Sequence, residues 1–491
     1  MNYNALKSGT DIRGVASALG GNTVNLTDAA VRDITAAFAL WLSIRLGKKA
    51  NVLVIAIGHD SRITAKDIKA NAIASLLCAG IHIIDCGMAS TPAMFMTTVE
   101  LGCDASIQIT ASHHPFDRNG LKFFTRSGGL DSSDITEIVT LANEGKAAPI
   151  ADGFITKTDF MTTYAAGLRK MICNSLNKSE ADLPLEGYHI IVDAGNGAGG
   201  FYAENVLKPL GADISGSQFL EPDGMFPNHI PNPENEKAME SICSAVVNNK
   251  ADLGIIFDTD VDRAGCVDAS GKEINRNRLI ALASYIVMQS EKGATIVTDS
   301  VTSDGLKTYI EKDLGGKHYR YKRGYKNVIN KAIELCKNGI NSPLAIETSG
   351  HAALKENYFL DDGAYLATKI VIELAKGKKF EDILSTLKMP KEEKEIRLNI
   401  KAEDFRTYGE KVITELHQFA EQHSNCRIAD DNREGIRITT ENGWMLLRLS
   451  VHDPVMPINF ESDEIGGTDK NVEFFREFYS RYSELDLKDY N

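Results

Sequence analysis

The sequence predicts an α/β protein of four domains: three similar α/β units and a C-terminal α+β domain. Apolar runs of three to six residues repeatedly end in polar, glycine-bearing loops, a pattern typical of buried, mostly parallel strands. The chain has 491 residues, more than a single hydrophobic core usually holds. The last hundred or so residues alternate apolar and polar positions instead, which indicates antiparallel hairpins.

The apolar runs are expected to be strands whose C-terminal loops carry the functional side chains, as is usual for α/β sheets. The expected strands cover residues 52–57, 105–109, 190–192, 253–257, 296–298 and 344–346. Helices are expected between Thr27 as N-cap and Gly47 as stop, over 279–288 and over 365–374. A hairpin is expected from strands 434–440 and 444–450.

The domain boundaries are predicted from two polar connectors. One runs from Asn174 to Leu185 and contains a proline, and the other is the charged segment 388–394. Together with the repetition of similar α/β units, which places boundaries near 160, 272 and 392, they give predicted domains of 1–160, 161–271, 272–391 and 392–491.

The composition excludes several classes of protein. The chain has 54 basic and 67 acidic residues, a net charge of −13, which disfavours binding to nucleic acid or to an anionic membrane. Any anionic substrate must then be held by a few locally placed arginines and lysines. The eight cysteines form no CxxC pair, which favours buried thiols in a reducing compartment. No apolar stretch reaches the ~20 residues of a membrane span, and the N-terminus lacks a secretory signal. We expect a cytoplasmic protein.

Three aspartates, Asp258, Asp260 and Asp262, follow the expected strand 253–257 at alternate positions. Carboxylates that converge on one point repel each other unless a cation lies between them, and hard oxygen ligands select Mg²⁺ or Ca²⁺. The alternatives are a solvated acidic turn and the nucleophile loop of haloacid dehalogenase-like phosphatases, which Asp258-Thr259-Asp260-Val261 fits loosely.

Ser112 lies in the loop after strand 105–109, followed by His113, His114 and, farther along, Lys122. A serine hydroxyl is a nucleophile that can carry phosphate, and nearby histidine, lysine and metal would offset the charge of a phosphoserine. Taken alone, Ser112 is better explained as a turn or N-cap serine.

Three further loops carry polar groups suited to a phosphorylated sugar. Glu347-Thr348-Ser349-Gly350-His351 offers a carboxylate and a hydroxyl for neighbouring sugar hydroxyls, or else a helix N-cap at Ser349. Arg448-Leu449-Ser450-Val451-His452-Asp453-Pro454 suits a phosphate dianion, or else is a hairpin end with an incidental arginine. Ser8 to Gly14, with Thr10 and Arg13, allows backbone close to a ligand, or else is a tight turn.

The five loops, in this order, resemble the α-D-phosphohexomutase family, which includes phosphoglucomutase and phosphomannomutase. Thr110 to Pro115 resembles the phosphoserine signature TASHxP, Asp258 to Arg263 the metal loop DxDxDR, and Glu347 to His351 the sugar loop ExSGH. The resemblance spans residues 8 to 462 and implies a fold of four domains around a central cleft, three similar α/β units with mixed sheets and a C-terminal α+β domain. It departs from the family at Val451-His452-Asp453, where Gly-Thr-Glu is usual, and at Lys322-Arg323-Gly324-Tyr325, where Tyr325 replaces a histidine.

The resemblance implies a phosphoglucomutase/phosphomannomutase that interconverts hexose 1-phosphate and hexose 6-phosphate through a phosphoserine and a hexose 1,6-bisphosphate. The alternatives are a phosphoglucosamine mutase and a non-catalytic sugar-phosphate-binding protein. The implied cofactors are Mg²⁺ and the bisphosphate as activator or intermediate; the implied partners are glucose or mannose phosphates, with a monomeric or weakly dimeric protein. The implied catalytic residues are Ser112, Arg13, Lys122 and His113, and the implied metal ligands are Ser112, Asp258, Asp260 and Asp262. The implied substrate-binding residues are Thr10, Arg263, Lys322, Glu347, Ser349, His351, Arg448, Ser450 and His452.

Overall fold

A computed structural model describes residues 2–450 and 453–490. The chain divides into two compact units. The first unit comprises the residues up to Asn275 together with Ser349–Asp382. The second unit comprises Arg276–Thr348 and the chain from Ile383 onward. Each unit is described by itself.

The first unit begins with an eight-stranded mixed sheet of order β1-β2-β6-β5-β3-β4-β8, with β7 paired to β6. The pairs β3–β4, β3–β5 and β4–β8 are parallel. The pairs β1–β2, β2–β6, β5–β6 and β6–β7 are antiparallel. Their bounds are β1 Lys7–Ser8, β2 Asp11–Val15, β3 Val54–His59, β4 His82–Met88, β5 Ala105–Ile109, β6 Arg118–Thr125, β7 Gly128–Gly129 and β8 Phe154–Lys157. The predicted strand 105–109 is confirmed residue for residue. The strand predicted at 52–57 starts later because Ala50–Val52 forms a 3-10 turn.

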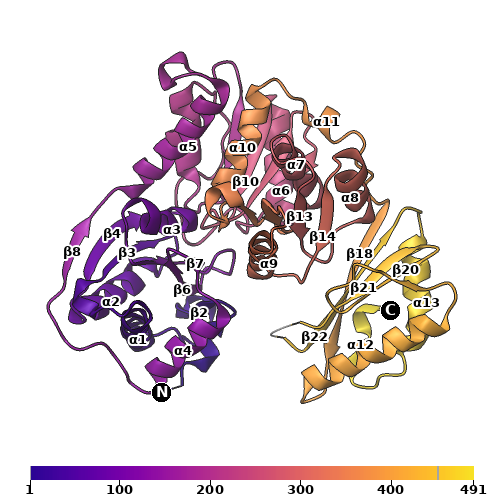
Figure 1. Cartoon of the computed structure of the whole chain (residues 1–491), viewed down its shortest axis with the longest axis horizontal. Coiled ribbons are helices and arrows are strands. Elements are labelled where there is room, and N and C mark those ends of the chain that lie inside the picture. The colour runs from indigo at the N-terminus through magenta and orange to yellow at the C-terminus, as the bar shows by residue number, and fades with distance from the viewer. Residues whose placement is uncertain (1, 451–452, 491) are drawn as a thin grey trace. The chain divides into compact units, whose positions relative to one another are not determined.

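Helices cover both faces of this sheet (Figure 1). α1 (Asp28–Leu46), α2 (Ala65–Cys78) and α4 (Ser132–Asn143) pack on one face, where the Phe38 and Phe123 rings lie 4.4 Å apart, and α3 (Thr91–Glu100) lies on the other. The predicted ends of α1 are confirmed. Thr27 Oγ1 accepts the Ala30 amide at 3.2 Å, and Gly47 takes the left-handed conformation with φ 62°.

The first unit also contains a second sheet of order β12-β11-β10-β9, in which β9 and β10 are parallel. Its strands are β9 Ile190–Asp193, β10 Leu253–Phe257, β11 Ala264–Asp268 and β12 Glu273–Ile274. α6 (Glu236–Asn249) packs on β9 and β10, while α10 (Gly363–Ala375) contacts both α5 (Phe160–Leu176) and the strands β10 and β11. The hairpin of β16 (Ala352–Leu354) and β17 (Leu360–Asp361) precedes α10.

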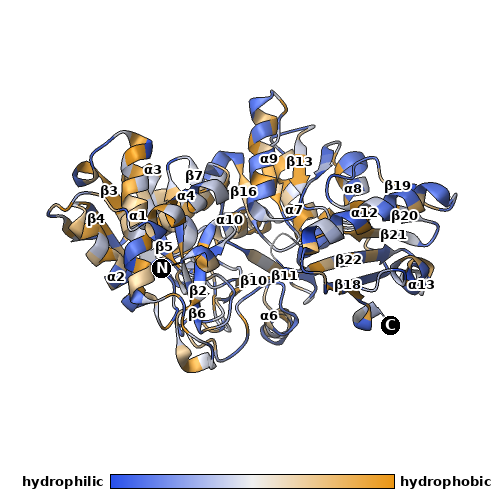
Figure 2. Cartoon of the chain, turned by 90° about the horizontal axis from the view of Figure 1, so that it is seen from below, coloured by the Kyte–Doolittle hydropathy of each residue, from blue (hydrophilic) through white to orange (hydrophobic). Residues whose placement is uncertain are grey.

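The second unit contains three parallel strands, β13 (Thr295–Thr298), β14 (Lys317–Arg320) and β15 (Leu344–Ile346), in the order β14-β13-β15. α9 (Tyr325–Lys337) packs on β13 and β15. It is amphipathic, with Val328, Ile329, Ala332 and Leu335 buried, and Figure 2 shows its mixture of hydrophilic and hydrophobic residues. α7 (Arg276–Met288) and the short α8 (Asp304–Thr308) complete this part, and α11 (Phe380–Ile383) follows α10.

The C-terminal part of the second unit is an antiparallel sheet of order β19-β20-β21-β22-β18-β23, packed against α12 (Phe405–Gln422) and α13 (Gly467–Tyr479). Its strands are β18 Glu392–Ile400, β19 Arg427–Ile428, β20 Ile436–Thr440, β21 Gly443–Leu447, β22 Val455–Ser462 and β23 Leu485–Asp486. β20 and β21 form the predicted hairpin. The fold class is thus confirmed as three α/β regions and a C-terminal α+β region, whereas the domain boundaries and the central cleft stay predictions.

Within the described residues, each helix is too short or too polar to span a bilayer.

Candidate active site

Ser112 lies in the loop after β5 and is 1% exposed. Its Oγ donates a hydrogen bond to Asp258 Oδ2 at 2.9 Å, and the Nδ1 of His113 is 3.3 Å from the same Oγ. The backbone of Ser112 has φ 49°, a left-handed conformation that costs a residue with a side chain about 1–3 kcal/mol. Such strain persists only where neighbouring groups hold it, which is frequent at functional sites.

The three aspartates of the loop after β10 converge. The carboxylate oxygens of Asp258, Asp260 and Asp262 lie within 4.8 Å of one another, and all three side chains are buried. One oxygen each of Asp260 and Asp262 is buried without a hydrogen-bond partner. Three buried carboxylates with two unpaired oxygens fit a hard divalent cation, so the solvated-turn interpretation is not supported by this geometry.

Lys122, on β6, neutralises part of this charge. Its Nζ lies 3.1 Å from Asp260 Oδ2 and 2.5 Å from Asp262 Oδ2, with the lysine 4% exposed. Burial alone would raise the pKa of Asp262, but Lys122 and the other nearby cations outweigh burial and hold that pKa below its usual range. Burial and the neighbouring carboxylates raise the pKa of Asp258 well above its usual range.

Arg263 connects the metal loop to the Ser112 loop, because its Nη2 donates to His113 Nδ1 at 2.7 Å. A guanidinium can only donate, so Nδ1 is the acceptor and the His113 proton lies on Nε2. Burial, reinforced by Arg263, lowers the pKa of His113 to about 2, and His113 is therefore neutral at physiological pH. Arg13, on β2, donates to the Ala111 carbonyl at 3.5 Å and pairs with Asp11 at 2.8 Å.

Ser349 and His351 belong to the first unit. They precede β16 rather than a helix, so the N-cap interpretation of Ser349 is wrong. Gly350 has φ 91°. The next residue, His351, forms an isolated antiparallel β-bridge with Arg263. His351 Nδ1 bonds to Asp361 and lies 4.0 Å from Asp262 Oδ1. Thr10 lies in the turn between β1 and β2.

The second unit holds the other predicted sugar and phosphate ligands. Glu347, at the end of β15, accepts the Gly324 amide at 2.6 Å. Arg448, just after β21, is 7% exposed, donates to Asn459 at 3.3 Å and has a buried Nε without a partner. Ser450 Oγ accepts the Asp453 amide at 3.2 Å. The predicted ligand His452, like Val451, lies outside the described residues.

A half-buried acid, Glu434, accompanies the cations of the second unit. Glu434 accepts hydrogen bonds from the Arg323 amide at 3.1 Å and from the Ser300 hydroxyl. Burial lowers the pKa of Arg448, and Glu434 is the strongest opposing charge. Lys322 precedes Arg323 in the loop after β14. The predicted phosphate ligands of this unit therefore share their surroundings with a carboxylate.

Sequence reasoning missed several residues around these groups. Asp60 and Arg62 are buried beside the Ser112 loop, Asp299 accepts the Thr348 hydroxyl at 2.6 Å, and Glu434 lies by Arg323. Asp60 and Arg62 follow the expected strand 52–57, but no sequence signal indicates which backbone groups an arginine will bind.

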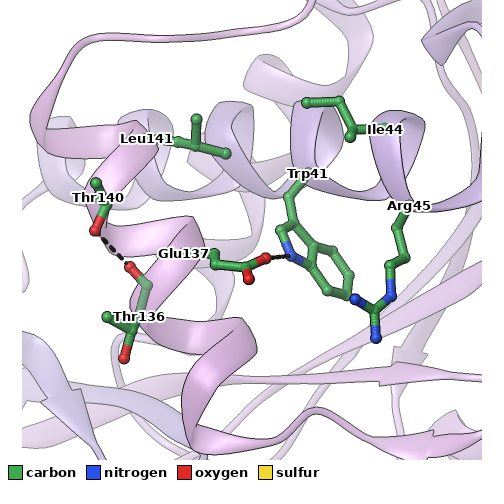
Figure 3. Close-up of a pocket in the computed structure, with 7 residues that line it drawn as sticks. All are labelled: Trp41, Ile44, Arg45, Thr136, Glu137, Thr140 and Leu141. Atoms are coloured by element: carbon green, nitrogen blue, oxygen red, sulfur yellow. Dashed lines mark hydrogen bonds between the residues drawn. The ribbon is translucent and has the colours of Figure 1, made fainter.

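A separate pocket is lined by residues of α1 and α4, and its lining is mainly apolar (Figure 3). Among its lining residues, Trp41 Nε1 donates to Glu137 at 2.8 Å, and Ile44 and Leu141 contribute apolar side chains. None of its seven lining residues is a predicted site residue.

Comparisons with known proteins agree with this geometry. The chain matches the phosphoglucomutase/phosphomannomutase alpha/beta/alpha domain I over residues 6–148, domain II over 162–271 and domain III over 275–389. It is 30% identical to a phosphoglucomutase of Neisseria gonorrhoeae over 455 residues, covering 92% of each chain. It is 28% identical to a phosphomannomutase/phosphoglucomutase of Pseudomonas putida over 86% of each chain. The crystal structure of a phosphoglucomutase/phosphomannomutase family protein from Burkholderia thailandensis superposes with a TM-score of 0.81 at 25% identity, covering 98% of each chain. The chain therefore belongs to the phosphoglucomutase/phosphomannomutase family.

Proposed function

We propose that the protein is a phosphohexomutase that interconverts hexose 1-phosphate and hexose 6-phosphate through a phosphate carried on Ser112. The observation that carries this proposal is the buried Ser112 hydroxyl, held 2.9 Å from Asp258 within the aspartate cluster. A phosphoserine at this point would be surrounded by the cationic groups of Lys122 and Arg263 and by a metal site.

In the proposed reaction, a free hydroxyl of the hexose phosphate attacks the phosphorus of phosphoserine 112. The new bond joins the sugar oxygen to phosphorus and the Ser112 Oγ–P bond breaks. The sugar hydroxyl proton passes to a base of the protein, and the released Ser112 oxygen takes up a proton to become a hydroxyl. His113, Lys122 and Arg13 are the candidates for this base; Nδ1 of His113 already accepts from Arg263 and its pKa is lowered to about 2, which makes His113 the weakest base of the three. The bisphosphorylated sugar then turns and returns its other phosphate to Ser112.

The proposed cofactor is Mg²⁺, held by Asp258, Asp260, Asp262 and an oxygen of phosphoserine 112. When bound, it would neutralise charge that develops on the transferred phosphoryl group. Lys122 already lies between two of these carboxylates, so its ammonium would hold them in place while the metal exchanges. Hexose 1,6-bisphosphate is the proposed intermediate and activator, because it can phosphorylate Ser112.

The second unit is proposed to bind the phosphate that is not being transferred. Arg448, with an unpaired buried Nε, Ser450 and Lys322 offer donors for a dianion, and His452 is proposed with them from the sequence. Glu347 and Ser349 are proposed to hold ring hydroxyls, with His351, Thr10 and Arg263 as further contacts. Glucose and mannose phosphates are the proposed substrates, and the protein is proposed to act in the cytoplasm as a monomer or weak dimer.

The proposal is tested by a coupled assay that compares glucose 1-phosphate, mannose 1-phosphate and glucosamine 1-phosphate, with glucose 1,6-bisphosphate as activator. We expect turnover of the first two, abolished by Ser112→Ala. Preferred turnover of glucosamine 1-phosphate would favour the phosphoglucosamine mutase. No turnover of any hexose phosphate would favour the sugar-phosphate-binding protein.

The phosphatase alternative makes a different prediction. An aspartate nucleophile would leave Ser112→Ala fully active, whereas Asp258→Asn would lose turnover. In the mutase, Ser112→Ala loses turnover outright because it removes the phosphate carrier.

A further inference from the structure

Arg62, in the loop after β3, is 2% exposed, and its side chain ends among backbone carbonyls of the Ser112 loop. Nη1 donates to the carbonyls of Pro115 at 2.7 Å and Arg118 at 2.8 Å. Nη2 donates to the carbonyls of Ser112 and His114, each at 2.5 Å. One planar guanidinium thus binds four carbonyls, a pattern that suits its rigid fork of donors and that an ammonium cannot reproduce.

Asp60 forms an ion pair with this guanidinium. It is fully buried, its Oδ1 accepts the Arg62 amide at 2.9 Å, and its Oδ2 lies 3.4 Å from Arg62 Nε. Asp60 also bonds to the Thr110 side chain, whose Oγ1 accepts the Ser112 amide at 2.8 Å. The Ser112 backbone is therefore held at its N–H through Thr110 and Asp60 and at its carbonyl by Arg62.

On its other side, Arg62 contacts the segment between β9 and α6. The guanidinium lies 5.2 Å from the centre of the Phe226 ring, and Arg62 forms a backbone bridge with Gly224. A Cβ on Gly224 would lie 2.4 Å from the Ile63 amide nitrogen, so only glycine allows this approach. Arg62 is thus enclosed between the serine loop and a loop of the neighbouring sheet.

We propose that Arg62 is a positioning residue that holds Ser112 in its left-handed conformation, with Oγ directed at the aspartate cluster. This inference rests on the proposed function of Ser112. The left-handed backbone of Ser112 is unfavourable by itself and needs groups that over-determine it. Arg62 touches the carbonyl side of Ser112 and none of the reacting atoms, so it acts on the rate of phosphoryl transfer through the placement of Oγ.

The test is Arg62→Lys in the full chain, with Arg32→Lys as the matched control. Arg32 is an exposed arginine of α1 in the same region that bonds to Asn71. For Arg62→Lys we expect kcat to fall about 100-fold or more, since a displacement of an attacking group by about 1 Å has such an effect, while KM for hexose phosphate stays within about threefold. Arg32→Lys should match the wild type in both constants.

Hydrogen exchange gives a readout that does not depend on turnover. In Arg62→Lys, the amides of residues 110–118 should exchange at least about tenfold faster, with the remaining protected amides unchanged. If Arg62→Lys does not fold, Thr110→Val replaces it. This near-isosteric change removes the hydroxyl that connects Asp60 to the Ser112 amide. We again expect faster exchange of the amides of residues 110–118 and a lowered kcat.

Arg62→Lys with wild-type kcat and wild-type exchange over 110–118 would overturn the proposal. A fall in kcat with faster exchange throughout the chain would overturn it as well, because it would indicate a general structural role. If the wild type has no mutase activity but Arg62→Lys still exchanges faster only over 110–118, the positioning role stays in place and the proposed function alone is refuted.

Discussion

Lys122→Met tests the electrostatics of the aspartate cluster. The Nζ of Lys122 lies 3.1 and 2.5 Å from two carboxylates that are themselves buried, so its removal leaves negative charge uncompensated. Breaking a buried ion pair by removal of one partner destabilises a protein by about 3–5 kcal/mol. At about 2 °C per kcal/mol for a body of this size, the first unit should unfold about 6–10 °C earlier than in the wild type.

The assay is thermal unfolding in EDTA and again with Mg²⁺, with Lys48→Met as the matched control. Lys48 pairs with Asp104 at 2.6 Å, but its side chain is 49% exposed, and such a pair contributes about 0–1 kcal/mol. Lys48→Met should therefore shift unfolding by no more than about 2 °C. Mg²⁺ should stabilise Lys122→Met more than the wild type, because the cation replaces the missing ammonium. Unfolding of Lys122→Met in EDTA within about 2 °C of the wild type would refute the reasoning.

Three other changes have calculable outcomes. Burial raises the pKa of Glu461 to about 7, so the folded state binds this proton more tightly than the unfolded state, and stability is lost as pH rises from about 4.5 to 7. Glu461→Gln should thus be more stable than the wild type above pH 7, by up to about 3 kcal/mol, in thermal unfolding across pH. Arg448→Lys should raise KM for hexose phosphates about tenfold or more in steady-state kinetics, because a charge-assisted hydrogen bond is worth about 1.5–3 kcal/mol. Gly197→Ala should weaken Mg²⁺ activation, measured by metal titration, because its Cβ would lie 2.5 Å from the Thr259 carbonyl oxygen of the metal loop.

Each of these has a control in the chain. Glu464→Gln, at an exposed glutamate, should show no pH-dependent gain, and an equal gain there would contradict the assignment to Glu461. Arg427→Lys, at a side chain 75% exposed, should leave KM unchanged. Gly167→Ala, within α5 with open space around its Cβ, should leave Mg²⁺ activation intact and stabilise slightly. Normal metal activation in Gly197→Ala would show that the metal loop tolerates displacement.

Local patterns were sufficient to predict the strands that present the site. The apolar run 105–109 and the caps Thr27 and Gly47 are local signals, because burial and capping depend on near neighbours, and the structure reproduces them. The Ser112 and Asp258 loops follow the C-terminal ends of β5 and β10, as the apolar runs predict. Ser112, ambiguous as a lone serine, became interpretable because several such loops occurred together.

Contacts between distant segments were not predictable in this way. Arg62 binds the carbonyl of a residue 50 positions away, and Lys122 meets Asp262 across 140 positions. Such contacts depend on sheet order and register, which periodicity does not encode. The same holds for Glu434, an acid within a predicted phosphate site, since its approach to Arg323 depends on the packing of the C-terminal sheet.

The central claim is that Ser112 carries the phosphate that the enzyme transfers. Its most direct measurement is phosphopeptide mass spectrometry of the protein after incubation with glucose 1,6-bisphosphate and Mg²⁺. The account predicts one phosphoryl group, located on Ser112, which is lost when excess hexose monophosphate is added and which does not form in Ser112→Ala. Phosphate on Asp258, or full mutase turnover with Ser112 unphosphorylated throughout, would contradict it.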